Sequence, residues 1–144
     1  MNLFGLLDVS ASALTAERQR AEVVTSNMAN AETTRTPQGG AYQRQLVVFR
    51  AQHMKQFGMQ LADFGRSAGT GVLVSDVVPD ARPPIQRYQP GHPDANKDGY
   101  VSYPAVDPVE ETTDLLEAVR AYELNASAVQ ATKNMISQSL DLLR

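Results

Sequence analysis

Hydrophobic residues recur at a seven-residue spacing near both ends of the chain. In the first segment the recurring positions are Leu7, Leu14, Ala21 and Met28. This spacing places apolar side chains along one face of a helix. We therefore predict an amphipathic helix over residues 4–31. The stretch 30–40 contains Asn, Thr, Pro and Gly and is expected to end the helix, because these residue types break helices.

The last segment carries a stronger helix pattern. Asp107, Pro108 and Glu110 suit an N-cap, a first helical residue and the third position of a capping-box variant. No glycine or proline follows residue 108. We predict a helix over residues 107–144, and its seven-residue series is Leu115, Tyr122, Val129, Ile136 and Leu143. Core packing is the expectation for Tyr122, because it belongs to this series.

The middle of the chain changes to a strand pattern. Four short runs rich in β-branched and aromatic residues are bounded by turn residues, and we predict strands at 45–49, 71–78, 85–88 and 100–103. The stretch 52–66 is ambiguous. Its apolar residues suit a helix face, but Gly58 inside it costs about 1 kcal/mol relative to alanine.

These elements predict an α+β fold with a small β-rich insert between two long helices. The expected inner domain combines an N-terminal helical part, residues 1–34, with a C-terminal helix, residues 107–144. A linker at 35–44 and a β-rich outer domain at 45–106 lie between them. A core built on such a small insert is marginal alone, and the insert is too small to cover both long helices. The apolar faces of the helices are therefore expected to pack against each other.

Charge is scarce in the second half of the last helix. Between Leu124 and Leu140 the only charged residue is Lys133, whereas an exposed helix face normally carries Glu and Lys pairs. Small, uncharged faces let helices approach closely on several sides, which favours a helix packed among others in an assembly. The alternative is an ordinary two-helix coiled coil with an uncharged outer face.

Composition narrows the function classes. The 144 residues carry a formal net charge of −3, so no basic field indicates a nucleic-acid binder. There is no cysteine, which excludes disulfides, thiolate zinc sites and cysteine nucleophiles. No run of 18 apolar residues predicts a membrane span. The first eight residues lack the basic region of a cleavable signal peptide, so we expect none.

One segment resembles half of a calcium-binding loop. Asp94, Asn96, Asp98 and Gly99 match the first half of an EF-hand loop. The position that should supply a bidentate Glu is Ala105, and prolines precede the loop. An Asx-rich turn, in which side chains bond to the backbone, is the favoured interpretation.

Two further motifs are weak. Gly65, Ser67 and Gly69 match the G-x-S-x-G nucleophile elbow, but a β-branched run follows where the elbow needs a helix. His53 and His92 are the only histidines, and two histidines cannot complete a zinc site without carboxylates. We therefore expect no catalytic, cofactor-binding or metal-binding site.

Three strings together resemble one family. They are residues 26–37 (Ser-Asn-Met-Ala-Asn-Ala-Glu-Thr-Thr-Arg-Thr-Pro), residues 91–104 (Gly-His-Pro-Asp-Ala-Asn-Lys-Asp-Gly-Tyr-Val-Ser-Tyr-Pro), and the closing-helix string 120–125 with 131–133 and 140–142. In this order and at this chain length, they resemble the FlgC family of proximal rod subunits of the bacterial flagellar basal body.

The resemblance implies a role as well as a fold. Terminal helices of such subunits form an inner layer around a channel, and the β-rich part forms an outer layer. Subunits stack helically into a periplasm-spanning drive shaft, after export by the flagellar apparatus without signal cleavage. The implied partners are copies of the chain, other proximal and distal rod subunits, the adaptor at the membrane ring and the export apparatus.

Assembly contacts are expected on both helices. The candidates are Leu7, Leu14, Asn27, Met28, Asn30, Arg120, Tyr122, Val129, Ile136 and Leu140. Asn27 and Asn30 suit either a helix C-terminus or amides that bond to a neighbouring subunit or to the facing helix. Arg120 lies off the apolar series and is freer to reach another chain. The rival functions are another axial subunit and a soluble coiled-coil adaptor with a peptide-binding β domain.

Overall fold

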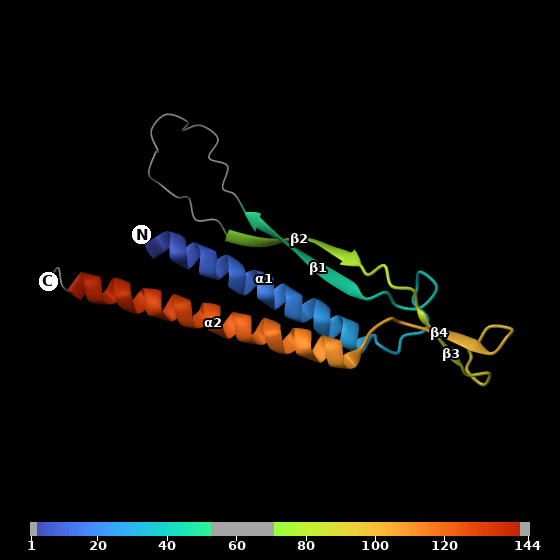
Figure 1. The fold of residues 1–144 in the computed structure, drawn as a ribbon. Coiled ribbons are helices and arrows are strands. Elements are labelled where there is room, and N and C mark those ends of the chain that lie inside the picture. The colour runs from blue at the N-terminus through green and yellow to red at the C-terminus, as the bar shows by residue number, and fades with distance from the viewer. Residues whose placement is uncertain (1–2, 53–70, 142–144) are drawn as a thin grey trace, which may run out of the picture.

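A computed structural model describes residues 3–52 and 71–141 of the chain. Two long helices, α1 (Leu3–Ala29) and α2 (Pro108–Asp141), lie side by side and run antiparallel (Figure 1). The first turn of α1 and the last turn of α2 therefore lie at the same end of the helix pair. The α+β fold with long terminal helices and a small β-rich middle is confirmed.

The helices begin and end where the local sequence predicts. The backbone N–H of Val109 donates to the Asp107 carboxylate at 2.9 Å, so Asp107 is the N-cap of α2. The last turn of α1 closes when the N–H of Asn30 donates to the carbonyl of Ser26 at 3.1 Å. Glu110, expected in a capping-box variant, directs its carboxylate towards two arginines instead.

All four expected strands form, and they pair into two separate ribbons. β1 (Gln45–Gln52) pairs antiparallel with β2 (Gly71–Pro79), and β3 (Ile85–Tyr88) pairs antiparallel with β4 (Tyr100–Tyr103). The β1–β2 ribbon lies along α1, whereas β3–β4 extends beyond the end of the helix pair that is far from the termini (Figure 1). Most of the ambiguous stretch 52–66 lies outside the described residues.

The β1–β2 ribbon is fastened to α1 at Ser12. Its hydroxyl accepts a hydrogen bond from the backbone N–H of Val72 at 3.0 Å and donates to the carbonyl of Val9 at 2.7 Å. The backbone approaches closely here, because a Cβ placed on Gly71 would stand 2.8 Å from Ser12 Oγ. Glycine at the start of β2 is therefore required by space rather than by backbone conformation.

The helices bury small and polar residues rather than their largest apolar ones. The buried residues of α1 and α2 in the described part are Ser10, Ala16, Val24, Asn27, Glu111, Ala118 and Thr132. The expectation that Tyr122 packs in the core is wrong, since 43% of this residue is exposed. Small side chains let the two helix backbones come close, and the bulkier series that contains Tyr122 is displaced to the edge of the contact.

Candidate functional site: the helix–strand joint and the exposed helix faces

A buried polar cluster lies where α1 ends, α2 begins and β1 starts. Its three central side chains are Asn27, Arg44 and Glu111, which we call the helix–strand joint. The exposed fractions are 1% for Asn27, 7% for Arg44 and 0% for Glu111. Polar groups removed from water this completely are costly unless they are hydrogen-bonded. The hydrogen bonds of the joint must therefore offset the cost of burying these three side chains.

Asn27 uses the full bonding capacity of its carboxamide. Its Nδ2 donates to the carbonyl of Gln45 at 2.9 Å and to Glu111 Oε2 at 3.1 Å. Its Oδ1 accepts from the N–H of Gln45 at 2.9 Å and from the hydroxyl of Tyr42 at 3.0 Å. Two donated and two accepted bonds saturate an amide side chain.

Arg44 connects β1 to the first turns of α2. Its Nε donates to Glu111, and its Nη2 donates to Asp114 at 3.1 Å. Burial by itself would lower the pKa of the Arg44 guanidinium, but the hydrogen bond and charge of Glu111, with help from Glu110, raise that pKa overall. Arg44 is therefore a fixed positive charge enclosed among carboxylates.

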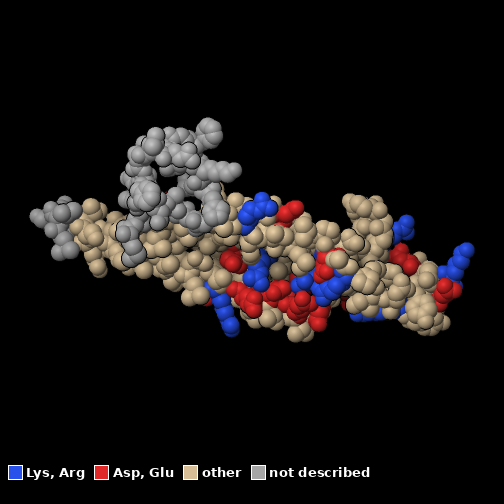
Figure 2. Space-filling view, turned by 45° about the horizontal axis from the view of Figure 1, so that its top comes forward, with Lys and Arg blue, Asp and Glu red and all other residues tan. Residues whose placement is uncertain are grey.

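Two further arginines surround the joint. Arg20 on α1 donates to Asp114 at 3.2 Å and to Glu117 at 3.3 Å, which ties the two helices together. Arg82 donates from Nε to Asp80 at 2.7 Å and from Nη1 to a carboxylate of α2. On the face shown in Figure 2, acidic and basic side chains gather over this middle part of the molecule.

Asp80 belongs to this network through backbone and side chain. Its Oδ1 accepts from the backbone N–H of Arg82 at 3.0 Å, and its own N–H donates to the carbonyl of Arg44 at 2.7 Å. The N–H of Arg82, followed by the Arg82 guanidinium, lowers the pKa of the Asp80 carboxyl. The carboxylate form is therefore the one that the folded chain stabilises.

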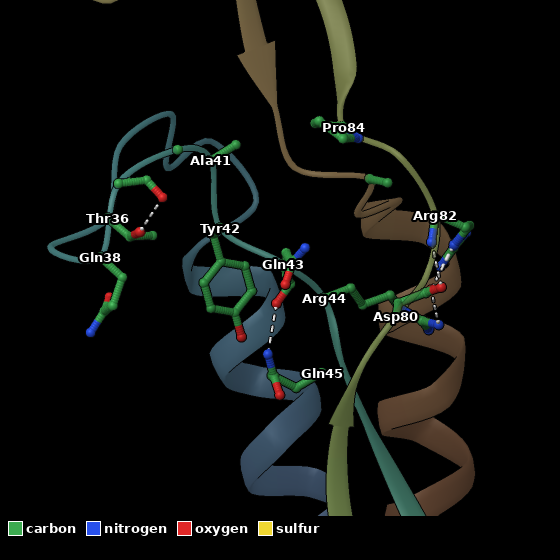
Figure 3. Close-up of a pocket in the computed structure, with 13 residues that line it drawn as sticks. Thr36, Gln38, Ala41, Tyr42, Gln43, Arg44, Gln45, Asp80, Arg82 and Pro84 are labelled. Atoms are coloured by element: carbon green, nitrogen blue, oxygen red, sulfur yellow. Dashed lines mark hydrogen bonds and ion pairs between the residues drawn. The ribbon is translucent and has the colours of Figure 1, made fainter.

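An open cleft of about 550 Å³ lies beside the joint. It is formed by the loop at 36–43, the start of β1 and the segment 80–84, with Ala105 at one side. Figure 3 shows Tyr42 over α1 and Arg44 extending towards Asp80 across the floor of the cleft. The residues that line the cleft thus include part of the joint, so its shape depends on the joint.

The second feature is a set of large apolar side chains that α2 leaves exposed. Its exposed large hydrophobic residues within the described range are Val109, Leu116, Val119, Tyr122, Leu124, Met135 and Leu140. Leu124 and Leu140 are the most exposed of those beyond the first three turns, at 72% and 61%. A shallow groove of about 250 Å³ between the helices is lined by Ala21, Ala118, Val119 and Tyr122 among others. Large apolar side chains exposed along one helix, with an apolar groove beside them, favour contact with other chains.

Comparison with known proteins identifies the family. Residues 7–35 match the family described as "Flagella basal body rod protein", and residues 97–142 match "Flagellar basal body rod FlgEFG protein C-terminal". "Flagellar basal-body rod protein FlgC" of Borreliella burgdorferi is 38% identical over 100% of this chain and 99% of its own length. The protein of the same description in Bacillus subtilis is 41% identical over 99% of each chain. The Escherichia coli O6:H1 protein so described is 37% identical over 99% of this chain and 98% of its own length.

The chain belongs to the FlgC family. Both matched segments contain a helix of the pair: residues 7–35 cover most of α1, and residues 97–142 cover β4 and α2. The resemblance noted from the three strings is thereby confirmed. None of the helices that the structure describes is both long and apolar enough to cross a membrane.

The residues expected to make FlgC assembly contacts fall into three groups. Leu7, Leu14, Met28, Asn30, Val129 and Ile136 are half-buried, and Arg120, Tyr122 and Leu140 are exposed. Asn27 is enclosed by its own chain, and its amide reaches the facing helix through Glu111. An interface role stays a prediction for all of them.

The sequence did not indicate the joint residues Arg44 and Glu111. An acid at position 111 fits the general preference for acids in the first turn of a helix, which the helix dipole favours, and Arg44 precedes a β-branched run without any motif. The only available signal was the pair of asparagines at 27 and 30, whose amides need partners. Asn27 meets a strand residue 18 positions away and a carboxylate 84 positions away, whereas the amide of Asn30 donates to the carbonyl of Ser26 in its own helix.

The loop at 94–99 behaves as an Asx-rich turn. Asn96 Oδ1 accepts from the backbone N–H groups of Asp98 and Tyr100, both at 2.9 Å. Asp94 accepts from the hydroxyl of Thr34 at 2.8 Å. No cluster of three or more metal-binding side chains forms within residues 3–52 and 71–141. His53 and Ser67, named above in weak motifs, lie outside the described residues.

Proposed function

We propose that this chain assembles through the exposed faces of α1 and α2 into the tubular proximal rod, transmits torque and lines the export channel. Membership of the FlgC family makes it a structural subunit of the flagellar basal-body rod. The single observation that carries the mechanism is that α2 leaves large apolar side chains exposed along its length, among them Leu116, Leu124 and Leu140. One antiparallel partner, α1, does not cover them.

The partners follow from the same arrangement. Copies of this chain and other proximal and distal rod subunits would pack against the helix faces, and the adaptor at the membrane ring would meet the base of the rod. The proposal includes passage through the flagellar export apparatus without signal cleavage, and a final position in the periplasm-spanning rod. The mechanical role requires no catalytic group.

Leu140→Glu tests the assembly face. The side chain is largely exposed, so the charge should leave the helix content of the isolated chain unchanged by circular dichroism. In a flagellated bacterium without its own FlgC protein, the variant should fail to restore rods and motility, because a buried unpaired carboxylate is costly in an assembled interface. The exposed Gln86→Glu on β3 is the matched control and should restore both.

Two outcomes would count against this function. Normal rods with the Leu140→Glu chain would show that this position of α2 is not in the interface, and they would overturn the mechanism. A soluble coiled-coil adaptor would instead form a discrete dimer at low concentration in sedimentation velocity, whereas a rod subunit should stay monomeric until other rod proteins are added.

A further inference from the structure

We propose that Asn27 is a positioning residue. Its carboxamide takes the place of a neighbouring strand beside the first residue of β1, and it fixes the direction in which the β1–β2 ribbon leaves the helix pair. The consequence for assembly rests on the proposed function. A rod subunit must present its ribbon and its helix faces to neighbours at one constant angle.

The geometry at Gln45 shows that the Asn27 side chain bonds to it as a neighbouring strand would. Both the N–H and the carbonyl of Gln45 bond to the Asn27 carboxamide, each at 2.9 Å. The position before it bonds across the ribbon, since the N–H of Asp80 donates to the carbonyl of Arg44. Positions of an antiparallel pair alternate between bonding across the ladder and pointing away from it. At Gln45, opposite Pro79, both backbone groups therefore point away from β2, and the side chain of α1 satisfies them.

Asparagine is the side chain that this place requires. An aspartate has the same size but cannot donate, so it would leave the Gln45 carbonyl without its bond. It would also bring a second carboxylate to within about a hydrogen-bond length of Glu111, which is fully buried. Like charges at that separation repel strongly in a dry site.

The joint closes into a ring of contacts. Asn27 bonds to Glu111, Glu111 accepts from Arg44, and Arg44 is followed by Gln45, which bonds back to Asn27. The ring therefore includes α1, α2 and β1. Because each member is held by the others, the ribbon and the helix pair should move as one body. Loss of Asn27 should loosen the ribbon while the two helices remain paired along the rest of their length.

Pulsed electron paramagnetic resonance on the full chain tests this inference. The absence of cysteine allows spin labels to be placed at single introduced cysteines. One pair, Gln19→Cys with Arg50→Cys, reports the ribbon relative to α1. A second pair, Gln19→Cys with Ser127→Cys, reports α1 relative to α2. All three positions are exposed.

Asn27→Asp should broaden the distance distribution of the ribbon pair at least twofold, with the helix pair and the helical circular dichroism unchanged. The exposed Asn134→Asp makes the same chemical change and should leave both distributions as in the parent. Adding Glu111→Gln to Asn27→Asp should narrow the ribbon distribution in part. The amide introduced at position 111 can donate to the carboxylate at position 27 and still accept from Arg44, which removes the repulsion, but the Gln45 carbonyl still lacks its donor.

Three results would overturn the inference. The first is a ribbon distribution of Asn27→Asp equal to that of the parent. The second is equal broadening of both pairs, because that would make Asn27 a general stability residue. The third applies if Asn27→Asp fails to fold: Asn27→Ser is uncharged but too short to bond to both backbone groups of Gln45, and an unchanged ribbon distribution in that variant would refute a positioning role. These measurements use the isolated chain, so they do not depend on the outcome of the Leu140→Glu test.

Discussion

Arg44 and Glu111 form an enclosed ion pair between the start of β1 and the first turn of α2, across 67 residues of sequence. Each side chain is almost fully buried. The pair joins the predicted linker, residues 35–44, to the C-terminal helix. Breaking it removes a tertiary connection and leaves a charge with no access to water.

Arg44→Met tests how much this pair contributes to the free energy of unfolding. The substitution leaves Glu111 without its cation in a buried site, and removal of one member of a buried pair costs about 3–5 kcal/mol. We expect a loss of that size in the free energy of unfolding, measured by urea denaturation. The control is Arg18→Met, which breaks an exposed pair with Glu22 and should cost no more than about 0.5 kcal/mol. Similar costs for the two variants would contradict the enclosed-pair interpretation.

Gly71→Ala should destabilise the attachment of β2 to α1. The added methyl group would stand 2.8 Å from Ser12 Oγ and 3.3 Å from Ser12 Cβ. Relief of this contact must displace the hydroxyl that accepts from Val72. We expect a loss of about 1–3 kcal/mol in thermal or urea unfolding. Gly91→Ala meets nothing within 4 Å and should change stability much less; an equal loss at both sites would rule out the steric cause.

Asp107→Ala should weaken the start of α2. The carboxylate accepts from the N–H of Val109, which would otherwise lack an intrahelical partner. Replacement of an N-cap by alanine costs about 1 kcal/mol. Asp107→Asn keeps an accepting oxygen and should stay within a few tenths of a kcal/mol of the parent. If both variants unfold at the same urea concentration, the cap is not the source of the effect.

Acidification should weaken the contact between Asp80 and Arg82. The pKa of Asp80 is lowered from its ordinary value of 3.8 by the N–H and the guanidinium of Arg82. A lowered carboxyl pKa contributes stability above the unfolded-state value, and that contribution disappears as the pH falls through the folded-state value. As the pH falls below about 4, Asp80→Asn should therefore lose less folding stability than the parent. Equal losses in acid-titrated thermal melts would show that Asp80 does not contribute.

Local sequence patterns were enough to predict the helices and strands. The seven-residue series predicts both helices, Asp107 and Pro108 mark the beginning of α2, and β-branched runs mark all four strands. These are local properties, because caps, turn residues and side-chain periodicity act over a few neighbouring residues. The three family strings also lie within continuous segments, so they could be recognised without the fold.

Which faces of the two helices meet depends on long-range contacts. On α2 the series turned inward is Glu111, Ala118 and Thr132, which lies beside the bulkier series that contains Tyr122. Periodicity locates the faces of a helix, but the choice between adjacent faces depends on how closely the partner can approach and on where buried charges find partners. Asn27, Arg44 and Glu111 satisfy one another only when three distant segments come together, which no local pattern encodes.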